Sequence, residues 1–293
     1  MKSSFIRLQA IIAVLLLLSV CTVGQQSKTV DVSRTPQVVR TTIRHEVRRF
    51  AYGGTLTVIG APAGSITIEG WPRNEVDVSA EIQLRADSEA DLDLLAAVNT
   101  FVLDEDANHL QILTTGTHDK AFMRSVAKKF PKTLLGLPWK VDYRIRVPFA
   151  IDLEVNAGRG PISIRSVEGN IRLSAAESDA NFKLTGGTLL ALVAIGKVTL
   201  QIPAKSWRGV GGELRLAAGD VSVEIPGGFS GDFDAEILRS GKISTSVEGL
   251  EPRERATQTA QKIKVRAGAG GATFNLIVGD GTIIIKKMEL GAE

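Results

Sequence analysis

The stretch Gly160-Pro161-Ile162-Ser163-Ile164, followed closely by Gly169-Asn170-Ile171-Arg172-Leu173, decides the fold. In each phrase a glycine precedes residues that alternate between apolar and polar. Alternation with a period of two predicts a β-strand with one buried and one solvated face. A glycine in front of such a strand marks a sharp turn of the chain.

The same phrase occurs three more times, at 64–68 (Gly-Ser-Ile-Thr-Ile), 219–223 (Gly-Asp-Val-Ser-Val) and 281–285 (Gly-Thr-Ile-Ile-Ile). From Asp152 on, strand-like segments recur about every nine residues. Many short strands at regular spacing predict a repetitive all-β fold. We therefore expect a glycine-punctuated β-solenoid or β-roll of short stacked strands, with an aliphatic interior too narrow for ligands.

The first 24 residues differ from the rest. Lys2 and Arg7 precede an apolar run, Ala10–Val20, which is too short to span a bilayer comfortably and is followed by small polar residues. This pattern predicts a secretory signal peptide that is cleaved after Gly24. The alternative is cleavage before Cys21 and a lipid anchor on that residue. In both cases we expect an extracytoplasmic location: the periplasm, the outer membrane surface or the medium.

The remaining residues divide into three predicted parts. Residues 25–49 are polar and basic and are interpreted as a tether, residues 50–287 as the β-repeat domain, and residues 288–293 as a C-terminal tail. Within the repeat domain, apolar residues at helical spacing over about 88–100, behind Ser88-Glu89-Ala90-Asp91, predict one short helix. The only cysteine of the chain is Cys21. If it is removed with the signal peptide, disulfides and thiolate metal sites are excluded.

The basic segment at the end of the tether is one candidate binding surface. It contains a dense cluster, namely Arg40, Arg44, His45, Arg48 and Arg49. We expect this segment to be an edge strand or a solvated arm. The alternative is a contact with an anionic envelope polymer or with lipid head groups.

A long insertion at about 114–140 is the second candidate. It interrupts the strand pattern with apolar and basic residues mixed together. It either caps the exposed end of the stacked strands or binds a membrane surface or a partner groove. The residues proposed to bind a partner are Phe122, Lys128, Lys129, Phe130 and Trp139.

The sequence shows no constellation of residues that points to catalysis. His45, His109 and His118 lack the spacing of metal ligands. The glycine-rich stretches 209–212 and 268–271 lack the lysine and the strand–loop–helix context of phosphate-binding loops. The net charge of +3 arises from 35 basic and 32 acidic residues mixed along the chain, which disfavours nucleic acid as a partner. We expect no catalytic site, no metal and no cofactor.

One enzymatic alternative is carbohydrate cleavage. Parallel β-helix enzymes place carboxylates on one outer face of neighbouring repeats, where two of them act together. Six carboxylates project from the predicted strands: Asp152, Glu154, Glu224, Asp232, Asp234 and Glu236. Cations on adjacent repeats (Arg165, Arg172 and Lys183) are expected to neutralise them through cross-strand pairs.

The stretch Tyr143-Arg144-Ile145-Arg146-Val147-Pro148, then Asp152-Leu153-Glu154-Val155 and the glycine-led strands, resembles the bacterial putative-adhesin family of unknown function (DUF4097, β-strand repeat-containing). The phrases at 64–71 and 278–285 are similar to its first and last repeats, and the likeness covers most of residues 50–287. The resemblance implies an exported β-solenoid or β-roll, and the family offers no established catalytic or binding residues. The insertion and the irregular segment 207–212 depart from the family pattern.

These observations lead to one functional expectation with two alternatives. We expect an exported, non-enzymatic protein that is a structural or adhesive component of the bacterial cell envelope. Its partner would be an envelope protein or polymer, with contact to the membrane surface as a further option, bound through a strand face or the insertion. The alternatives are a carbohydrate-active β-helix enzyme (a polysaccharide lyase or hydrolase) and an accessory of envelope assembly or stress signalling.

Overall fold

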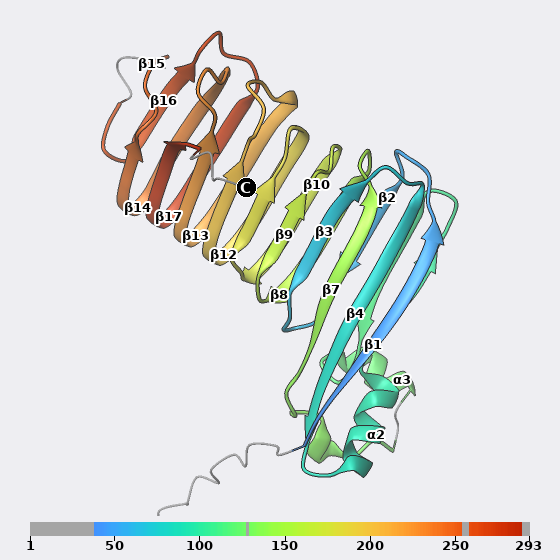
Figure 1. Cartoon of the computed structure of the whole chain (residues 1–293). Helices are drawn as coiled ribbons and strands as arrows, with labels where there is room; N and C mark the ends of the chain where they lie inside the picture. Colours follow the sequence, from blue (N-terminus) through green and yellow to red (C-terminus); the bar gives the residue numbers. More distant parts are fainter. Residues whose placement is uncertain (1–37, 127–128, 254–257, 289–293) are drawn as a thin grey trace, which may run out of the picture. The chain divides into compact units, whose positions relative to one another are not determined.

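The computed structural model describes residues 38–126, 129–253 and 258–288. In this part of the chain, 17 strands join into one mixed sheet that curls strongly into a half-barrel, accompanied by short helices (Figure 1). The prediction of a mostly β chain is therefore confirmed. The predicted signal peptide, Cys21 and almost all of the predicted tail lie outside the described residues.

Most neighbouring strands are parallel, and they form two series. Ladder A contains β6 (His109–Thr115), β2 (Thr55–Ile59), β8 (Asp152–Arg159), β10 (Asn170–Glu177) and the first halves of β12 (Gly186–Gln201), β13 (Arg208–Ile225), β17 (Thr273–Lys287) and β14 (Gly231–Thr245). Ladder B contains β7 (Trp139–Pro148), β3 (Ile66–Trp71), β9 (Ile162–Arg165), β11 (Ala180–Lys183) and the second halves of the same four long strands.

Antiparallel strands extend both ladders. β5 (Thr100–Glu105) pairs with β6, while β4 (Glu75–Ala86) and then β1 (Val38–Arg49) continue ladder B beyond β7. At the opposite end, β16 (Lys262–Ala267) and β15 (Leu250–Pro252) continue ladder A beyond β14.

The position of β1 corrects one prediction. Residues 38–49 belong to the sheet and not to a tether, since β1 pairs with β4 along its whole length. The alternation of β1 was hard to recognise in the sequence because its apolar residues Val39, Ile43 and Val47 lie on the exposed face. The opposite face of the strand carries arginines, which form the contacts described below.

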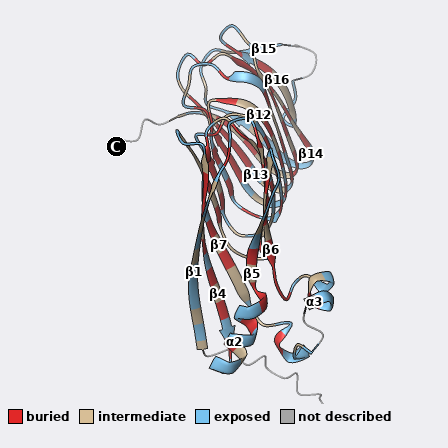
Figure 2. Cartoon of the chain, turned by 90° about the vertical axis from the view of Figure 1, so that its right-hand side faces the viewer, coloured by how far each residue is buried: buried red, intermediate tan, exposed pale blue. Residues whose placement is uncertain are grey.

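The spacing of the central strands explains the predicted repeat. Leu153, Ile171 and Leu189 are 18 residues apart, lie side by side in ladder A and are all buried. Each repeat supplies one strand to each ladder, so that strands recur at about half this spacing. The inner faces of both ladders contribute to one buried apolar cluster, and Figure 2 shows buried and exposed residues alternating along the strands.

Four of the five glycine phrases meet at one corner of the sheet, where the chain passes from ladder A to ladder B. Gly64 lies beside Gly160, and Gly219 lies between Gly196 and Gly281. The φ angles of Gly219 and Gly281 are 129° and 147°, a region that side chains of L-residues rarely allow. A Cβ on Gly281 would lie 1.7 Å from the carbonyl oxygen of Gly219. Close contact between backbones therefore requires glycine at this corner.

The helix predicted at about 88–100 corresponds to α2 (Glu89–Val98). The side chain of Ser88 accepts a hydrogen bond from the N–H of Asp91, which satisfies a donor at the helix start. Leu92 and Leu95 are buried, and the helix packs against β4.

The prediction of a single helix is wrong. The insertion contains a second helix, α3 (Lys120–Val126), and a 3-10 turn, η1 (Lys132–Leu134). The carboxylate of Asp119 accepts hydrogen bonds from the N–H groups of Ala121 and Phe122, at 2.8 and 3.0 Å, and so stabilises the start of α3. None of the described helices has the length and apolar character needed to cross a bilayer.

A buried hydroxyl pair joins the two ladders near the insertion. The hydroxyl of Tyr143 in β7 lies 2.8 Å from Oγ1 of Thr114 in β6, and Thr114 donates its only hydroxyl proton to the carbonyl of Ile59. Tyr143 must therefore be the donor to Thr114. Burial raises the pKa of Tyr143 to about 12, although the charge of Arg44 opposes the shift. The neutral phenol is thus part of the folded structure.

We expect this pair to make the protein sensitive to high pH. An unfolded tyrosine titrates near pH 10, whereas Tyr143 in the folded chain titrates near 12. Between these two pH values the folded chain binds more protons than the unfolded chain. The free energy of unfolding therefore falls as the pH rises, by about 2–3 kcal/mol in total. This contribution is complete below about pH 10 and lost above about pH 12.

Urea denaturation of wild type and Tyr143→Phe across this pH range measures the effect. The variant should lose less stability than wild type on going to high pH, because its phenol is absent. Tyr52→Phe serves as the control, since Tyr52 is 44% exposed. Identical alkaline profiles for wild type and Tyr143→Phe would contradict the assignment.

Candidate functional site

The insertion covers the end of the sheet at which β6 ends and β7 begins, and α3 lies near α2 at this end (Figure 1). Leu134 of η1 is buried in the apolar core, and Phe130, Leu137 and Trp139 pack against it. These contacts favour the interpretation of the insertion as a cap. Other side chains of the insertion do not take part in these core contacts.

A groove remains on the surface of this cap, with a volume of about 690 Å³. We call it the cap groove and define it by its lining residues: Thr117, His118, Lys120, Met123, Arg124, Phe130, Lys132 and Leu135. Met123 is buried, with 8% of its surface exposed, while Leu135 is 40% exposed. The volume lies within the range of small-molecule sites, and the groove offers both apolar contact and charge.

The turn that leads into α3 is anchored to the core. Oδ1 of Asn99, the C-cap residue of α2, accepts a hydrogen bond of 2.9 Å from the N–H of Thr117. Gly116 lies so close to Asn99 and Trp139 that a Cβ would stand 2.3 Å from Oδ1 of Asn99. The beginning of the cap groove is therefore fixed in position relative to β5 and β6.

The charged side chains that line the cap groove are all cationic. Lys120, Arg124 and Lys132 line it, and no ion pair joins any of them to a carboxylate within the described ranges. Asp119 is the only acidic residue between 114 and 140. The hydrogen bonds that Asp119 accepts from the N–H groups of Phe122 and Ala121 hold the pKa of its carboxyl below the usual range. Asp119 also attracts Arg124 electrostatically, without forming an ion pair with it. The groove thus presents an excess of positive charge, which Asp119 offsets only in part.

His118 stands at one side of the cap groove. Its ring lies against Trp139, with the ring centroids 5.3 Å apart. Desolvation of the ring lowers the pKa of His118, while Asp119 opposes the shift, although the residue as a whole is exposed. The shift favours the neutral form of the imidazole.

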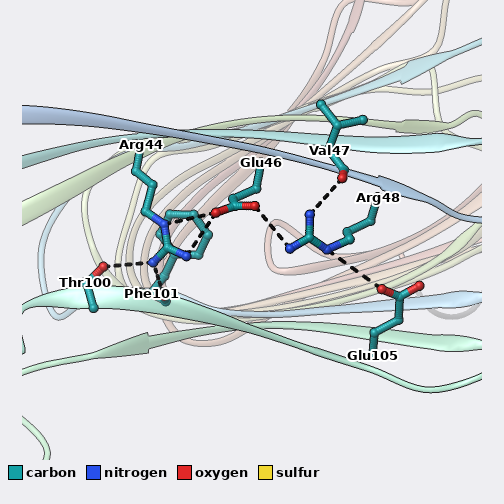
Figure 3. Close-up of polar contacts among 7 residues, drawn as sticks. All are labelled: Arg44, Glu46, Val47, Arg48, Thr100, Phe101 and Glu105. Carbon is teal, nitrogen blue, oxygen red and sulfur yellow. Dashed lines mark hydrogen bonds and ion pairs between the residues drawn. The ribbon is translucent and has the colours of Figure 1, made fainter.

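The basic residues of β1 have a different environment, and Figure 3 shows two of them, Arg44 and Arg48. Arg44 of β1 donates to the carbonyl of Phe101 in β5 at 2.5 Å, and its guanidinium lies 4.4 Å from the centre of the Phe101 ring. Glu46 is paired with both Arg44 and Arg48, each at 3.1 Å. These residues connect β1 to β5, so the arginines close a seam between two edge strands.

The other basic residues of β1 are also largely engaged. Arg40 pairs with Glu89 and Asp93 of α2, at 2.5 and 2.7 Å, and His45 lies 2.8 Å from Asp77. Arg49 is exposed. Since most of these cations have carboxylate partners within the chain, β1 favours the edge-strand interpretation over that of an anion-binding surface.

The outer-face carboxylates are held by polar partners, with one exception. Asp232 and Asp234 are bound by Arg266 and Arg253, both at 2.8 Å, and Glu236 by Lys262 at 3.1 Å. Glu224 pairs with Lys286 at 3.0 Å, and Asp152 accepts from the N–H of Asn170. Only Glu154 has no such partner among the described residues, and it lies opposite Arg172 in the register.

The predicted partners of these carboxylates are largely wrong. Arg165 pairs with Glu69 at 2.8 Å instead, because β3 lies beside β9 and places Glu69 opposite Arg165 in the register. Lys183 lies next to Arg165 and Gln201. The register of the ladders, which the sequence does not specify, decides which charges meet.

The structure places the five predicted partner-binding residues in different surroundings. Phe130 lines the cap groove, and Lys129 precedes it on the exposed surface. Phe122 is half-buried on α3 outside the groove lining, and Trp139 begins β7. Lys128 lies outside the described residues.

Most residues of the cap groove, including Lys120, Arg124 and Lys132, were not among the predicted binding residues. The spacing of Lys120 and Arg124, four residues apart, places both on one face of a helix and is the signal that identifies them. It was not used because no helix was expected there. Within the described residues, no group of three or more His, Cys, Asp or Glu side chains is placed to hold a metal ion.

The fold and the site together define a mostly β protein with a curled mixed sheet and a cationic, partly apolar groove at one end. No family model matches the sequence, and no curated protein matches it. Among solved structures, the chain is similar to bacterial proteins described as putative adhesins or cell adhesion proteins.

Three of these structures illustrate the similarity. A putative cell adhesion protein from Clostridium sporogenes is 14% identical, with 84% of this chain and 100% of that chain covered and a TM-score of 0.45. A putative adhesin from Bacteroides fragilis is 11% identical, with 84% and 97% covered and a TM-score of 0.27. A putative adhesin from Parabacteroides distasonis is 7% identical, with 83% and 97% covered and a TM-score of 0.25. At these TM-scores the similarity is weak, and no residue of the site is inferred from it.

Proposed function

We propose that this chain is an exported, non-enzymatic β-repeat protein of the adhesin-like DUF4097 type, which serves as a structural or adhesive component of the bacterial cell envelope. Export is supported by the basic and apolar pattern of residues 1–24. A solenoid-type repeat is supported by the parallel ladders and by the 18-residue spacing of Leu153, Ile171 and Leu189.

The observation that carries the proposal is the contrast between two surfaces. On the outer faces of the ladders, five of the six candidate carboxylates are held by cations or by a backbone N–H, which favours a structural role for them. The cap groove combines apolar side chains with cations that have no carboxylate partner in the described part of the chain. Such a surface suits attachment to an anionic component of the envelope.

Sedimentation with envelope fractions tests attachment. The purified protein is mixed with washed envelopes of the producing bacterium, and the bound fraction is measured at low and at high salt. We expect binding that weakens with salt, because the contact involves exposed charges. Protein that stays in the supernatant at low salt would contradict an envelope-binding role.

A second measurement tests the non-enzymatic part of the proposal. The protein is incubated with a panel of acidic polysaccharides, and new reducing ends are measured. We expect none, because two carboxylates that are locked in ion pairs cannot readily act as general acid and base. Release of reducing ends that disappears in Glu154→Gln would favour the carbohydrate-active alternative.

A further inference from the structure

We propose that the cap groove binds an anionic phospholipid at a membrane surface, with its acyl chain against Met123, Phe130 and Leu135 and its phosphate near Lys120, Arg124 and Lys132. This inference rests on the proposed function and names the ligand class of the same site.

The apolar part of the cap groove requires an apolar ligand group. Of its lining residues, Met123 is buried, Phe130 is half-buried and Leu135 is 40% exposed. A soluble polyanion would leave these side chains in water. An acyl chain would cover them and so add apolar burial to the charge interaction.

The cationic part of the cap groove requires an anion. Lys120 and Arg124 lie one helical turn apart on α3, and Lys132, the first residue of η1, also lines the groove. Among the described residues no carboxylate forms an ion pair with any of these three cations, in contrast to Arg40, Arg44 and Arg48 of β1. Long basic side chains around an apolar surface are the arrangement by which amphipathic segments bind anionic lipids.

The groove is also well placed for contact with a surface. α3 lies at the end of β4 and β7, and the strands β12 to β17 stack away from it (Figures 1 and 2). The lipid-binding side chains therefore lie at one end of the sheet. They can contact a membrane while the strands at the other end stay away from it.

Co-sedimentation with vesicles tests the proposal. Vesicles of phosphatidylcholine alone are compared with vesicles that contain equal parts of phosphatidylcholine and phosphatidylglycerol. We expect the protein to bind the anionic vesicles at least about tenfold more strongly, and raised salt to weaken the binding. Equal binding to both kinds of vesicle, or binding to neither, would overturn the proposal.

Charge-neutralised variants locate the binding site. Lys120→Gln/Arg124→Gln/Lys132→Gln should reduce binding to the anionic vesicles at least about tenfold. The matched control is Arg172→Gln/Lys183→Gln/Lys242→Gln, which removes the same number of exposed cations from the ladders. The control should bind almost as well as wild type. Similar losses in both variants would mean that net charge alone attracts the protein, which overturns the groove as the site.

A tryptophan probe tests whether the apolar part of the cap groove contacts acyl chains, and it leaves the charge of the protein unchanged. Relative to wild type, which contains three tryptophans, Leu135→Trp should add emission that shifts to shorter wavelength with anionic vesicles, because the new side chain enters an apolar environment. Val210→Trp is the control, since Val210 is 76% exposed on β13, and its added emission should not shift. Absence of a shift at position 135 in vesicle-bound protein would overturn the placement of the acyl chain.

The outcomes separate this inference from the function on which it rests. If the protein binds envelopes but not anionic vesicles, the lipid proposal is wrong and attachment to an envelope protein or polymer stands. If it binds neither, both proposals are wrong.

Discussion

Replacement of Ile171 by aspartate should lower the free energy of unfolding by about 4 kcal/mol or more, enough to unfold much of the protein. Ile171 is 1% exposed and lies between Leu153 and Leu189 in ladder A, both equally buried. A carboxylate there would lie among buried apolar side chains, and no Lys, Arg or His is buried among the described residues, so it must either be neutralised or separate the strands. Thermal unfolding monitored by circular dichroism measures the loss.

Two variants make this a test of which face is buried. Ser163→Asp places the same charge on the outer face of β9, beside Thr67 and Asn181, and should change stability by about 0.5 kcal/mol or less. Ile171→Val keeps the site apolar and should cost about 0.5–1.5 kcal/mol. If the two aspartate variants unfolded at the same temperature, the assignment of Ile171 to the inner face and of Ser163 to the outer face would be wrong.

Replacement of Gly281 by alanine should lower the free energy of unfolding by about 3 kcal/mol or more, a large effect for the addition of a single methyl group. Its φ of 147° is costly for any residue with a side chain. In addition, the new Cβ would lie 1.7 Å from the carbonyl oxygen of Gly219, which is part of the neighbouring backbone and cannot rotate away. Relief of this contact requires β17 and β13 to move apart and to lose ladder hydrogen bonds.

Gly136→Ala is the matched control for this prediction. A Cβ on Gly136 would meet nothing within 4 Å, and its φ is not in the region that excludes side chains. Alanine there should be neutral or stabilising by up to about 1 kcal/mol, because it restricts the unfolded chain. Urea denaturation of both variants measures the difference, and equal stabilities would show that the corner does not require glycine.

The alternating pattern was enough to predict much of the fold. Ile162, Ile164 and Ile171 were assigned to the interior from their spacing alone, and all three are buried. This works because successive side chains of a strand point to opposite faces whatever its neighbours are. The helix near 88–100 was recognisable for a similar reason, since the cap at Ser88 is a local interaction.

The order of the strands in the sheet could not be predicted from the sequence. β17, the last strand in sequence, lies between β13 and β14 and pairs with both. Nothing in the local pattern of Ile283 and Ile285 distinguishes a central position from an edge. Pairing between distant strands depends on how the intervening chain folds back, which is a property of the whole sheet.

The candidate site shows the same division. The sequence determined by itself that the chain is rich in strands, where glycine must turn it, and that basic residues gather in two segments. Only the tertiary structure decided that Arg40, Arg44 and Arg48 meet carboxylates of α2 and β1, whereas Lys120, Arg124 and Lys132 surround an apolar groove. The reason is physical: alternation and turns are local properties of the backbone, whereas the partner of a charge is set by which distant strand or helix comes within a few ångströms of it.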